Sequence, residues 1–177
     1  MRELIKTAIL IFFTFIVFSE TLSAQNSPPQ FKDGEKVVFY GDSITHGGWY
    51  EYYIQLFYAT RFPESKITIE NAGISGASAS GSLSRLESDV LSRKPDTVYI
   101  MFGMNDVGRN NYKAAQADEK TLASRETSLK SYRTAMDETI KKIKSSGVTP
   151  VVVTPSPYNQ YGQNIKTENL AVCNDGL

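Results

Sequence analysis

Four short runs rich in β-branched and aromatic residues recur along the chain. They are KVVFYG (36–41), KITIENAG (66–73), DTVYIMFG (96–103) and VTPVVVTPSP (148–157). Each has the composition and the length of a buried strand. Strands separated by segments of helical length predict parallel, right-handed crossover units. The expected fold is therefore α/β, a three-layer α/β/α sandwich around a parallel sheet.

The segments between these runs predict helices. Residues 49–62 (WYEYYIQLFYATRF) are almost apolar all round, so we expect this helix to be largely covered. Residues 80–95 place three apolar residues at helical spacing before Pro95: Leu83, Leu86 and Val90. Residues 123–147 form a third amphipathic helix, for which Gly147 is the expected C-terminal cap. One apolar face of this helix carries Leu129, Tyr132, Met136, Ile140 and Ile143.

The first 24 residues differ from the rest. They begin with two basic residues (MRELIK), continue with an apolar run (TAILIFFTFIVF) and end in a small-residue stretch at Ala24. This order is typical of a secretory signal peptide. We interpret 1–24 as this leader and 25–177 as one domain, located outside the cytoplasm. A membrane anchor that stays attached is the alternative, although the apolar run is short for a span.

Charge and cysteine content exclude several classes of function. The chain has 19 basic and 19 acidic residues and no basic cluster, so nothing indicates a nucleic-acid partner. Its single cysteine, Cys173, cannot form an intramolecular disulfide, and no Cys/His spacing typical of a metal site occurs. We expect no metal and no organic cofactor; in particular, no phosphate-binding glycine motif follows the first strand.

Three of the expected strands end in polar or glycine residues. Asp42 and Ser43 follow the first, Asn71–Gly73 end the second, and Gly103–Asp106 follow the third. Because ligands of open parallel sheets bind at the carboxyl ends of the strands, these segments should meet at one edge. That convergence predicts a functional site.

The residue types suit acyl transfer, which needs a nucleophile and donors aimed at the developing oxyanion. Ser43 is the candidate nucleophile. Gly73 can bring a backbone N–H close to a ligand, and Asn105 offers a neutral amide donor. Taken singly, Asp42–Ser43 could be a helix cap and the other two segments could be turns. Their occurrence at successive strand ends favours catalysis.

These motifs resemble those of the SGNH (GDSL-type) hydrolases. FYGDSIT is similar to the first block of that family, NAGISG to the second and FGMND to the third, in the family's order, over about residues 36–155. The resemblance implies a flavodoxin-like strand order. It also implies that Ser43 is the nucleophile and that the oxyanion hole consists of the Ser43 N–H, the Gly73 N–H and the Asn105 amide.

The family's fourth block, Asp-x-x-His, supplies the general base, and it does not occur in this sequence. The only histidine, His46, lies three residues after Ser43, and we interpret it as a loop residue or a substrate contact rather than the base. The fourth strand would also be an uncovered edge. We therefore expect a sequence that is incomplete at its C-terminus and, in this form, inactive.

The expected substrate is a small-molecule or polysaccharide ester, with carbohydrate acetyl esters favoured. Aromatic residues that could stack on sugars near the site are Trp49, Tyr50, Tyr112, Tyr158 and Tyr161, although they could equally pack the surface. The alternatives are a lipase or lysophospholipase acting on long acyl chains, and a secreted glycan-binding module without catalysis.

Overall fold

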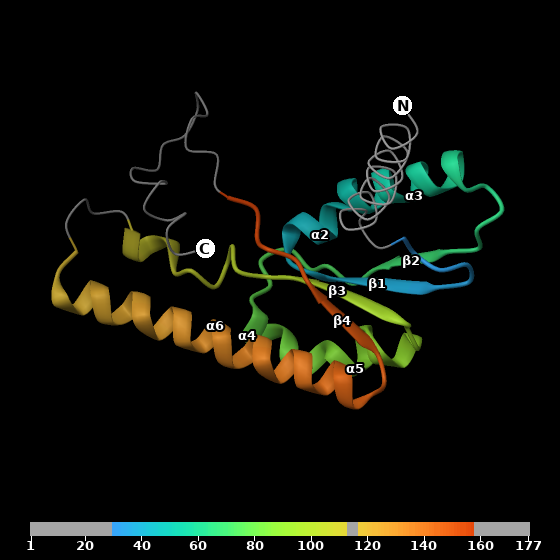
Figure 1. Cartoon of the computed structure of the whole chain (residues 1–177). Helices are drawn as coiled ribbons and strands as arrows, with labels where there is room; N and C mark the ends of the chain where they lie inside the picture. The colour runs from blue at the N-terminus through green and yellow to red at the C-terminus, as the bar shows by residue number, and fades with distance from the viewer. Residues whose placement is uncertain (1–29, 113–116, 158–177) are drawn as a thin grey trace, which may run out of the picture. The chain divides into compact units, whose positions relative to one another are not determined.

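The computed structural model describes residues 30–112 and 117–157 of the chain (Figure 1). Backbone contacts divide the chain into Met1–Phe31 and Lys32–Leu177, and the fold described below belongs to the second unit. The expected leader (1–24), Cys173 and the C-terminal stretch from 158 lie outside the described residues. In the part that is described, no helix combines the length and the apolarity needed to cross a membrane.

All four predicted strands are present in one parallel sheet. They are β1 (Lys36–Gly41), β2 (Thr68–Asn71), β3 (Thr97–Met101) and β4 (Thr149–Val152), in the order β2-β1-β3-β4. This order matches the first four positions of the flavodoxin-like arrangement. The carboxyl ends of β2, β1 and β3 are therefore neighbours, as the sequence predicted.

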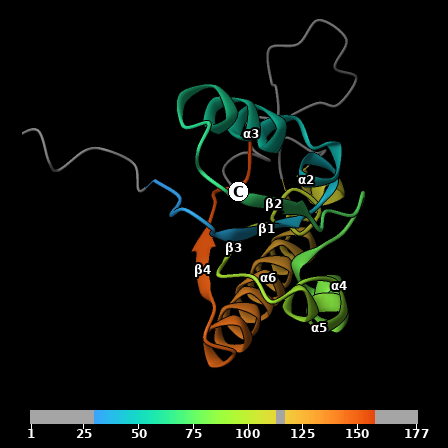
Figure 2. The ribbon, with the colours of Figure 1, turned by 90° about the vertical axis from the view of Figure 1, so that its right-hand side faces the viewer.

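Helices cover both faces of the sheet, so the predicted three-layer sandwich is confirmed. Figure 2 shows α3 (Trp49–Arg61) over one face, with α4 (Ala79–Ser82), α5 (Leu86–Asp89) and α6 (Glu119–Ser145) over the other. A five-residue helix, α2 (Ser43–Gly47), links β1 to α3.

Alternate residues of the central strands are buried on opposite sides of the sheet. Val38 and Ile100 belong to the cluster that packs against α5 and α6, together with Leu86, Met136 and Ile143. On the other side the ring of Phe39 contacts the rings of Tyr50 and Tyr99, at centroid distances of 5.4 Å and 5.0 Å. Burial on both faces explains the nearly continuous apolar runs.

The helix expected over 80–95 is broken into short turns. Two 3₁₀ turns, Leu83–Arg85 and Leu91–Arg93, alternate with α4 and α5. Within this stretch the Ser88 hydroxyl donates to the Arg85 oxygen at 3.2 Å and the Ser92 hydroxyl to the Ser88 oxygen at 2.6 Å. Bonds of this kind compete with regular helical hydrogen bonding. The expected apolar face is nevertheless buried at Leu86 and Val90.

The prediction that the 49–62 helix is largely covered is wrong within the described residues. Only Glu51 of α3 is buried, whereas Trp49 and Tyr53 are 71% and 61% exposed. Figure 2 shows α3 with the short α2 beside it on this face of the sheet, and no further described element covers the outer side of α3.

Helix α6 begins four residues before the predicted start. Asp118 causes the earlier start, because its carboxylate accepts the Thr121 N–H at 2.8 Å as an N-terminal cap. At the other end Gly147 has a φ of +76°, which agrees with its predicted capping role. Of the predicted apolar face, Met136 and Ile143 are buried and Leu129 is exposed.

Candidate active site

Ser43 is displayed at the carboxyl end of β1. It is the first residue of α2, and Asp42 caps that helix by accepting the Ile44 N–H at 3.0 Å. Asp42 is almost fully buried, and this burial raises the pKa of its carboxyl. Ser43 itself is exposed, and its hydroxyl has no hydrogen-bond partner among the described residues. The cap is therefore Asp42, which leaves the serine hydroxyl available.

Gly41, the last residue of β1, lies where the backbone is too crowded for a side chain. A Cβ at this position would lie 2.2 Å from the Thr45 Oγ1 and 2.6 Å from the Met101 backbone oxygen. Only glycine lets β1 pass between β3 and the first turn of α2.

Gly73 lies in the loop after β2, directly against α2. A Cβ on Gly73 would come within 2.2 Å of the His46 backbone nitrogen and 2.6 Å of the Thr45 carbonyl carbon. Its N–H donates to the Asn71 Oδ1 at 2.8 Å, within its own turn. The second strand end thus touches the helix that carries Ser43.

Asn105 follows β3 and contacts the same loop further along. Its side-chain nitrogen donates to the Ala77 oxygen at 2.9 Å, which leaves a second amide hydrogen for a ligand. The neighbouring Asp106 accepts the Ala79 N–H at 2.9 Å and the Gly103 N–H at 3.1 Å, and burial raises the pKa of its carboxyl. The loop between β2 and α4 (residues 72–78, called the β2 loop below) therefore contacts both the segment that carries Ser43 and the segment that carries Asn105.

Arg85 is a further residue at this edge that the sequence did not single out. Its guanidinium donates to the Ala72 oxygen at 2.8 Å and to the Gly41 oxygen at 3.2 Å. It also lies 4.6 Å from the centroid of the Tyr40 ring and pairs with Asp89 at 3.3 Å. Arg85 thereby joins the carboxyl ends of β1 and β2.

His46 does not contact the Ser43 hydroxyl through any described hydrogen bond. Its Nδ1 lies 3.2 Å from the Gly73 backbone oxygen, on an exposed surface. His46 lies in α2, so the interpretation of it as a loop residue is wrong, and a contact with substrate stays a prediction.

Glu51 is a second residue that the sequence reasoning missed. Its carboxylate accepts the Asn71 side-chain N–H at 2.9 Å, and the residue is only 3% exposed. Burial raises the pKa of this carboxyl from the usual 4.5 to about 7. An acid within the otherwise apolar WYEYYIQLFY run was the indication available in the sequence.

The aromatic residues expected at the site edge have different roles. The Tyr50 hydroxyl forms a hydrogen bond with the Thr45 Oγ1 at 2.8 Å, and the Tyr50 ring packs on Phe39. Tyr50 therefore stabilises the packing of α3 against α2 and β1. Tyr112 is buried beneath the Arg125 guanidinium, 4.1 Å from its ring centroid. Trp49 is exposed, and Tyr158 and Tyr161 lie outside the described residues.

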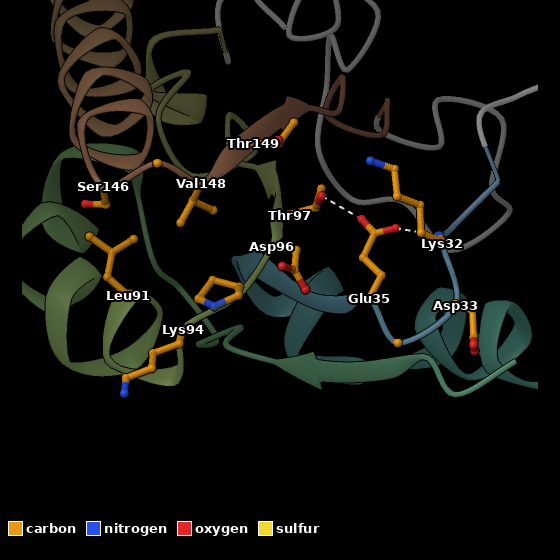
Figure 3. A pocket seen from close by; sticks show the side chains of 13 residues that line it. Lys32, Asp33, Glu35, Leu91, Lys94, Asp96, Thr97, Ser146, Val148 and Thr149 are labelled. Carbon is orange, nitrogen blue, oxygen red and sulfur yellow. Dashed lines mark hydrogen bonds between the residues drawn. The ribbon is translucent and has the colours of Figure 1, made fainter.

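Two polar hollows lie at opposite ends of the sheet. One, of about 400 Å³, adjoins the site and is lined by Met104, Asn105, Gly108, Arg109, Asn110 and Asn111. The other, of about 580 Å³, lies where β1, β3 and β4 begin; there Glu35 accepts hydrogen bonds from Thr97 and Lys32 (Figure 3). Because parallel sheets bind ligands at strand carboxyl ends, the first hollow is the one that suits a substrate.

Comparisons with known proteins identify a family and several relatives. A model of the GDSL-like lipase/acylhydrolase family matches residues 39–174. The acetylxylan esterase of Geobacillus stearothermophilus is 39% identical over 92 residues, which cover 43% of this chain and 42% of that protein. The uncharacterized lipoprotein YqeF of Bacillus subtilis (strain 168) is 28% identical over 131 residues, covering 70% of this chain and 49% of YqeF. The chain thus spans less than half of the length of either relative.

Solved structures are similar as well. A gut microbial diltiazem-metabolizing enzyme superposes with a TM-score of 0.73 at 31% identity, covering 85% of this chain and 34% of that one. The Geobacillus acetylxylan esterase superposes with a TM-score of 0.58 at 25% identity, covering 84% and 72%. Catalytic mutants of that esterase have been solved with a serine, an aspartate or a histidine replaced.

Proposed function

The chain belongs to the GDSL-like lipase/acylhydrolase family, and we propose that it provides the nucleophile and the oxyanion hole of a serine ester hydrolase. Ser43 is the nucleophile; the Ser43 N–H, the Gly73 N–H and the second amide hydrogen of Asn105 are the oxyanion donors. The observation that supports this proposal most is the exposed Ser43 hydroxyl, which has no hydrogen-bond partner within residues 30–112 and 117–157, at the sheet edge where the two strands beside β1 lead into Gly73 and Asn105.

In this proposal the Ser43 Oγ forms a bond to the carbonyl carbon of an ester and releases its proton to water. Negative charge then develops on the carbonyl oxygen, and preorganised donors stabilise it; each donor contributes roughly 10²–10³ in turnover. The Gly73 N–H, which donates to the Asn71 Oδ1 at 2.8 Å, would share its hydrogen with this oxygen. The C–O bond to the alcohol then breaks, the alcohol leaves with a proton, and water hydrolyses the acyl-serine to the free acid.

The general base is not assigned to any described residue. The 177 residues contain no Asp-x-x-His, and the His46 ring lies against the Gly73 oxygen. We therefore propose that this chain, by itself, turns esters over slowly.

The proposed substrate is an acetylated carbohydrate. Support comes from the likeness to an acetylxylan esterase and from the polar hollow beside Asn105, where Asn110 and Arg109 offer donors suited to sugar hydroxyls. An acyl esterase for long chains would favour an apolar groove at this place. Action outside the cytoplasm is also proposed, supported by the leader-like residues 1–24 and by the likeness to the lipoprotein YqeF.

Boronic acids test this proposal, because they form tetrahedral adducts with a nucleophilic serine and so imitate the intermediate. Methylboronic acid copies an acetyl group and octylboronic acid a long acyl chain. We expect the chain to bind the methyl compound at least as tightly as the octyl compound, by calorimetry. Tighter binding of octylboronic acid through Ser43 would favour the long-chain esterase.

The glycan-binding alternative makes a different prediction. A pure binding module has no use for the Ser43 hydroxyl. Binding of an acetylated xylooligosaccharide, together with no boronate adduct at Ser43, would support that alternative and contradict the hydrolase.

A further inference from the structure

The side-chain amide of Asn71 forms hydrogen bonds with three segments: α2, α3 and the turn at Gly73. Its nitrogen donates to the Thr45 backbone oxygen in α2 and to the Glu51 Oε2 at 2.9 Å in α3. Its oxygen accepts the Gly73 N–H at 2.8 Å. One amide group therefore ties the β2 end to the helix that begins at Ser43.

Glu51 and the Thr45 backbone oxygen together determine which way this amide faces. An Asn side chain can rotate by half a turn and exchange its oxygen and nitrogen. The Glu51 carboxylate accepts from the nitrogen, as the Thr45 oxygen does, and so helps to keep the Asn71 oxygen on the side of Gly73. The other oxygen of Glu51, Oε1, is buried without a hydrogen-bond partner among the described residues.

A buried carboxylate with an unpartnered oxygen is costly for the fold. Glu51 is also the only buried residue of α3, a helix whose other side chains are partly or largely exposed. No ion pair of Glu51 occurs among the described residues; its carboxylate accepts from the Asn71 side chain at 2.9 Å and also interacts with Tyr50. The bond to Asn71 is the contact through which Glu51 reaches the turn that carries the Gly73 N–H.

We propose that Glu51 and Asn71 are positioning residues, which together fix the direction of the Gly73 N–H and its distance from the Ser43 helix. The inference rests on the proposed function, in which Gly73 is an oxyanion donor. Glu51 acts only through Asn71 and does not touch the substrate.

Two readouts test the pair in the 177-residue chain. The first is the hydrogen-exchange rate of the Gly73 amide, measured by NMR, which reports its hydrogen bond without any need for activity. The second is the affinity for methylboronic acid. In that reaction the Ser43 Oγ forms a bond to boron and releases its proton to solvent, which leaves a tetrahedral, singly negative boronate.

Glu51→Ala and Asn71→Ala should each accelerate exchange at Gly73 and weaken boronate binding by about tenfold, the effect of a misdirected donor. Glu51→Gln should restore both values, because its amide oxygen still accepts from Asn71. The double variant should behave like Asn71→Ala alone, since the first residue acts through the second. Glu87→Ala, which removes an exposed carboxylate elsewhere, is the control.

Unchanged exchange and affinity in both alanine variants would overturn the proposal. Tighter boronate binding by Asn71→Ala would also overturn it, because Asn71 would then compete with the ligand for the Gly73 N–H. If the unaltered chain forms no adduct at Ser43, the proposed function fails, whereas the exchange rates still decide whether the pair orients Gly73.

Discussion

Gly73 lies so close to His46 that a Cβ on residue 73 would come within 2.2 Å of the His46 backbone nitrogen. The β2 loop and the Ser43 helix are therefore in contact through backbone atoms, which cannot move aside as a flexible side chain would.

Gly73→Ala should separate these two segments. We expect a loss of about 1–3 kcal/mol in the free energy of unfolding, the usual cost of overpacking, together with weaker boronate binding. Gly47→Ala is the matched control, because its Cβ would meet only the Trp49 ring at 3.6 Å. Urea denaturation measures both variants, and equal stability of the two would contradict the close contact.

Arg85→Lys should loosen the strand ends although the charge is kept. The guanidinium reaches the Gly41 and Ala72 oxygens with two nitrogens, and a single ammonium group cannot reproduce that fork. We expect a loss of about 1–2 kcal/mol in stability, with Arg133→Lys on α6 as the control. A stability equal to that of the unaltered chain would show that the two hydrogen bonds contribute nothing.

Glu51→Gln should change how stability depends on pH. Burial raises the pKa of Glu51 to about 7, so the folded state holds its proton more tightly than the unfolded state. Stability from this group is complete below about pH 4.5 and is lost as the pH rises through about 7. The variant cannot ionise there and avoids this loss.

The difference in Tm, variant minus unaltered chain, should therefore become more positive from about pH 5 to about pH 8, by the equivalent of on the order of 2–3 kcal/mol. Thermal unfolding followed by circular dichroism measures it, with the exposed Glu64→Gln as the control. A Tm difference that stays constant over this range would mean that Glu51 does not titrate there.

Slow turnover is expected for p-nitrophenyl acetate. Loss of the base from a serine triad lowers turnover by roughly 10⁶. The release of p-nitrophenol by the chain should thus barely exceed that of Ser43→Ala. Rapid release that depends on Ser43 would reveal a base in these residues, and His46→Asn would then show whether it is His46.

The fold was predictable from the sequence because its strands are buried on both faces. Runs such as VVFYG carry their own β propensity, and their glycine and polar ends mark the carboxyl edge. The exposure of α3 was not predictable, because an apolar helix shows its composition but not whether another element covers it. The breaks at 83–93 were not predictable either, because a hydrophobic period does not register local hydrogen bonds such as those of the Ser88 and Ser92 hydroxyls.

The three proposed site residues could be predicted from their positions at strand ends. The contacts that hold them in place could not be predicted in this way. Arg85 reaches oxygens that lie 13 and 44 residues away in the chain, and Glu51 meets Asn71 across 20 residues. Pairings at such separations follow from the packing of α2, α3 and the β2 loop. A single sequence gives no rule that selects them.

Whether Ser43 is a nucleophile beside working oxyanion donors can be measured by ¹¹B NMR with methylboronic acid. We expect a tetrahedral boron signal with the unaltered chain and with Ser84→Ala, which replaces an exposed serine elsewhere. We expect no such signal with Ser43→Ala and at least about tenfold weaker binding with Asn105→Ala. An adduct that persists in Ser43→Ala, or no adduct with the unaltered chain, would show that Ser43 is not the nucleophile.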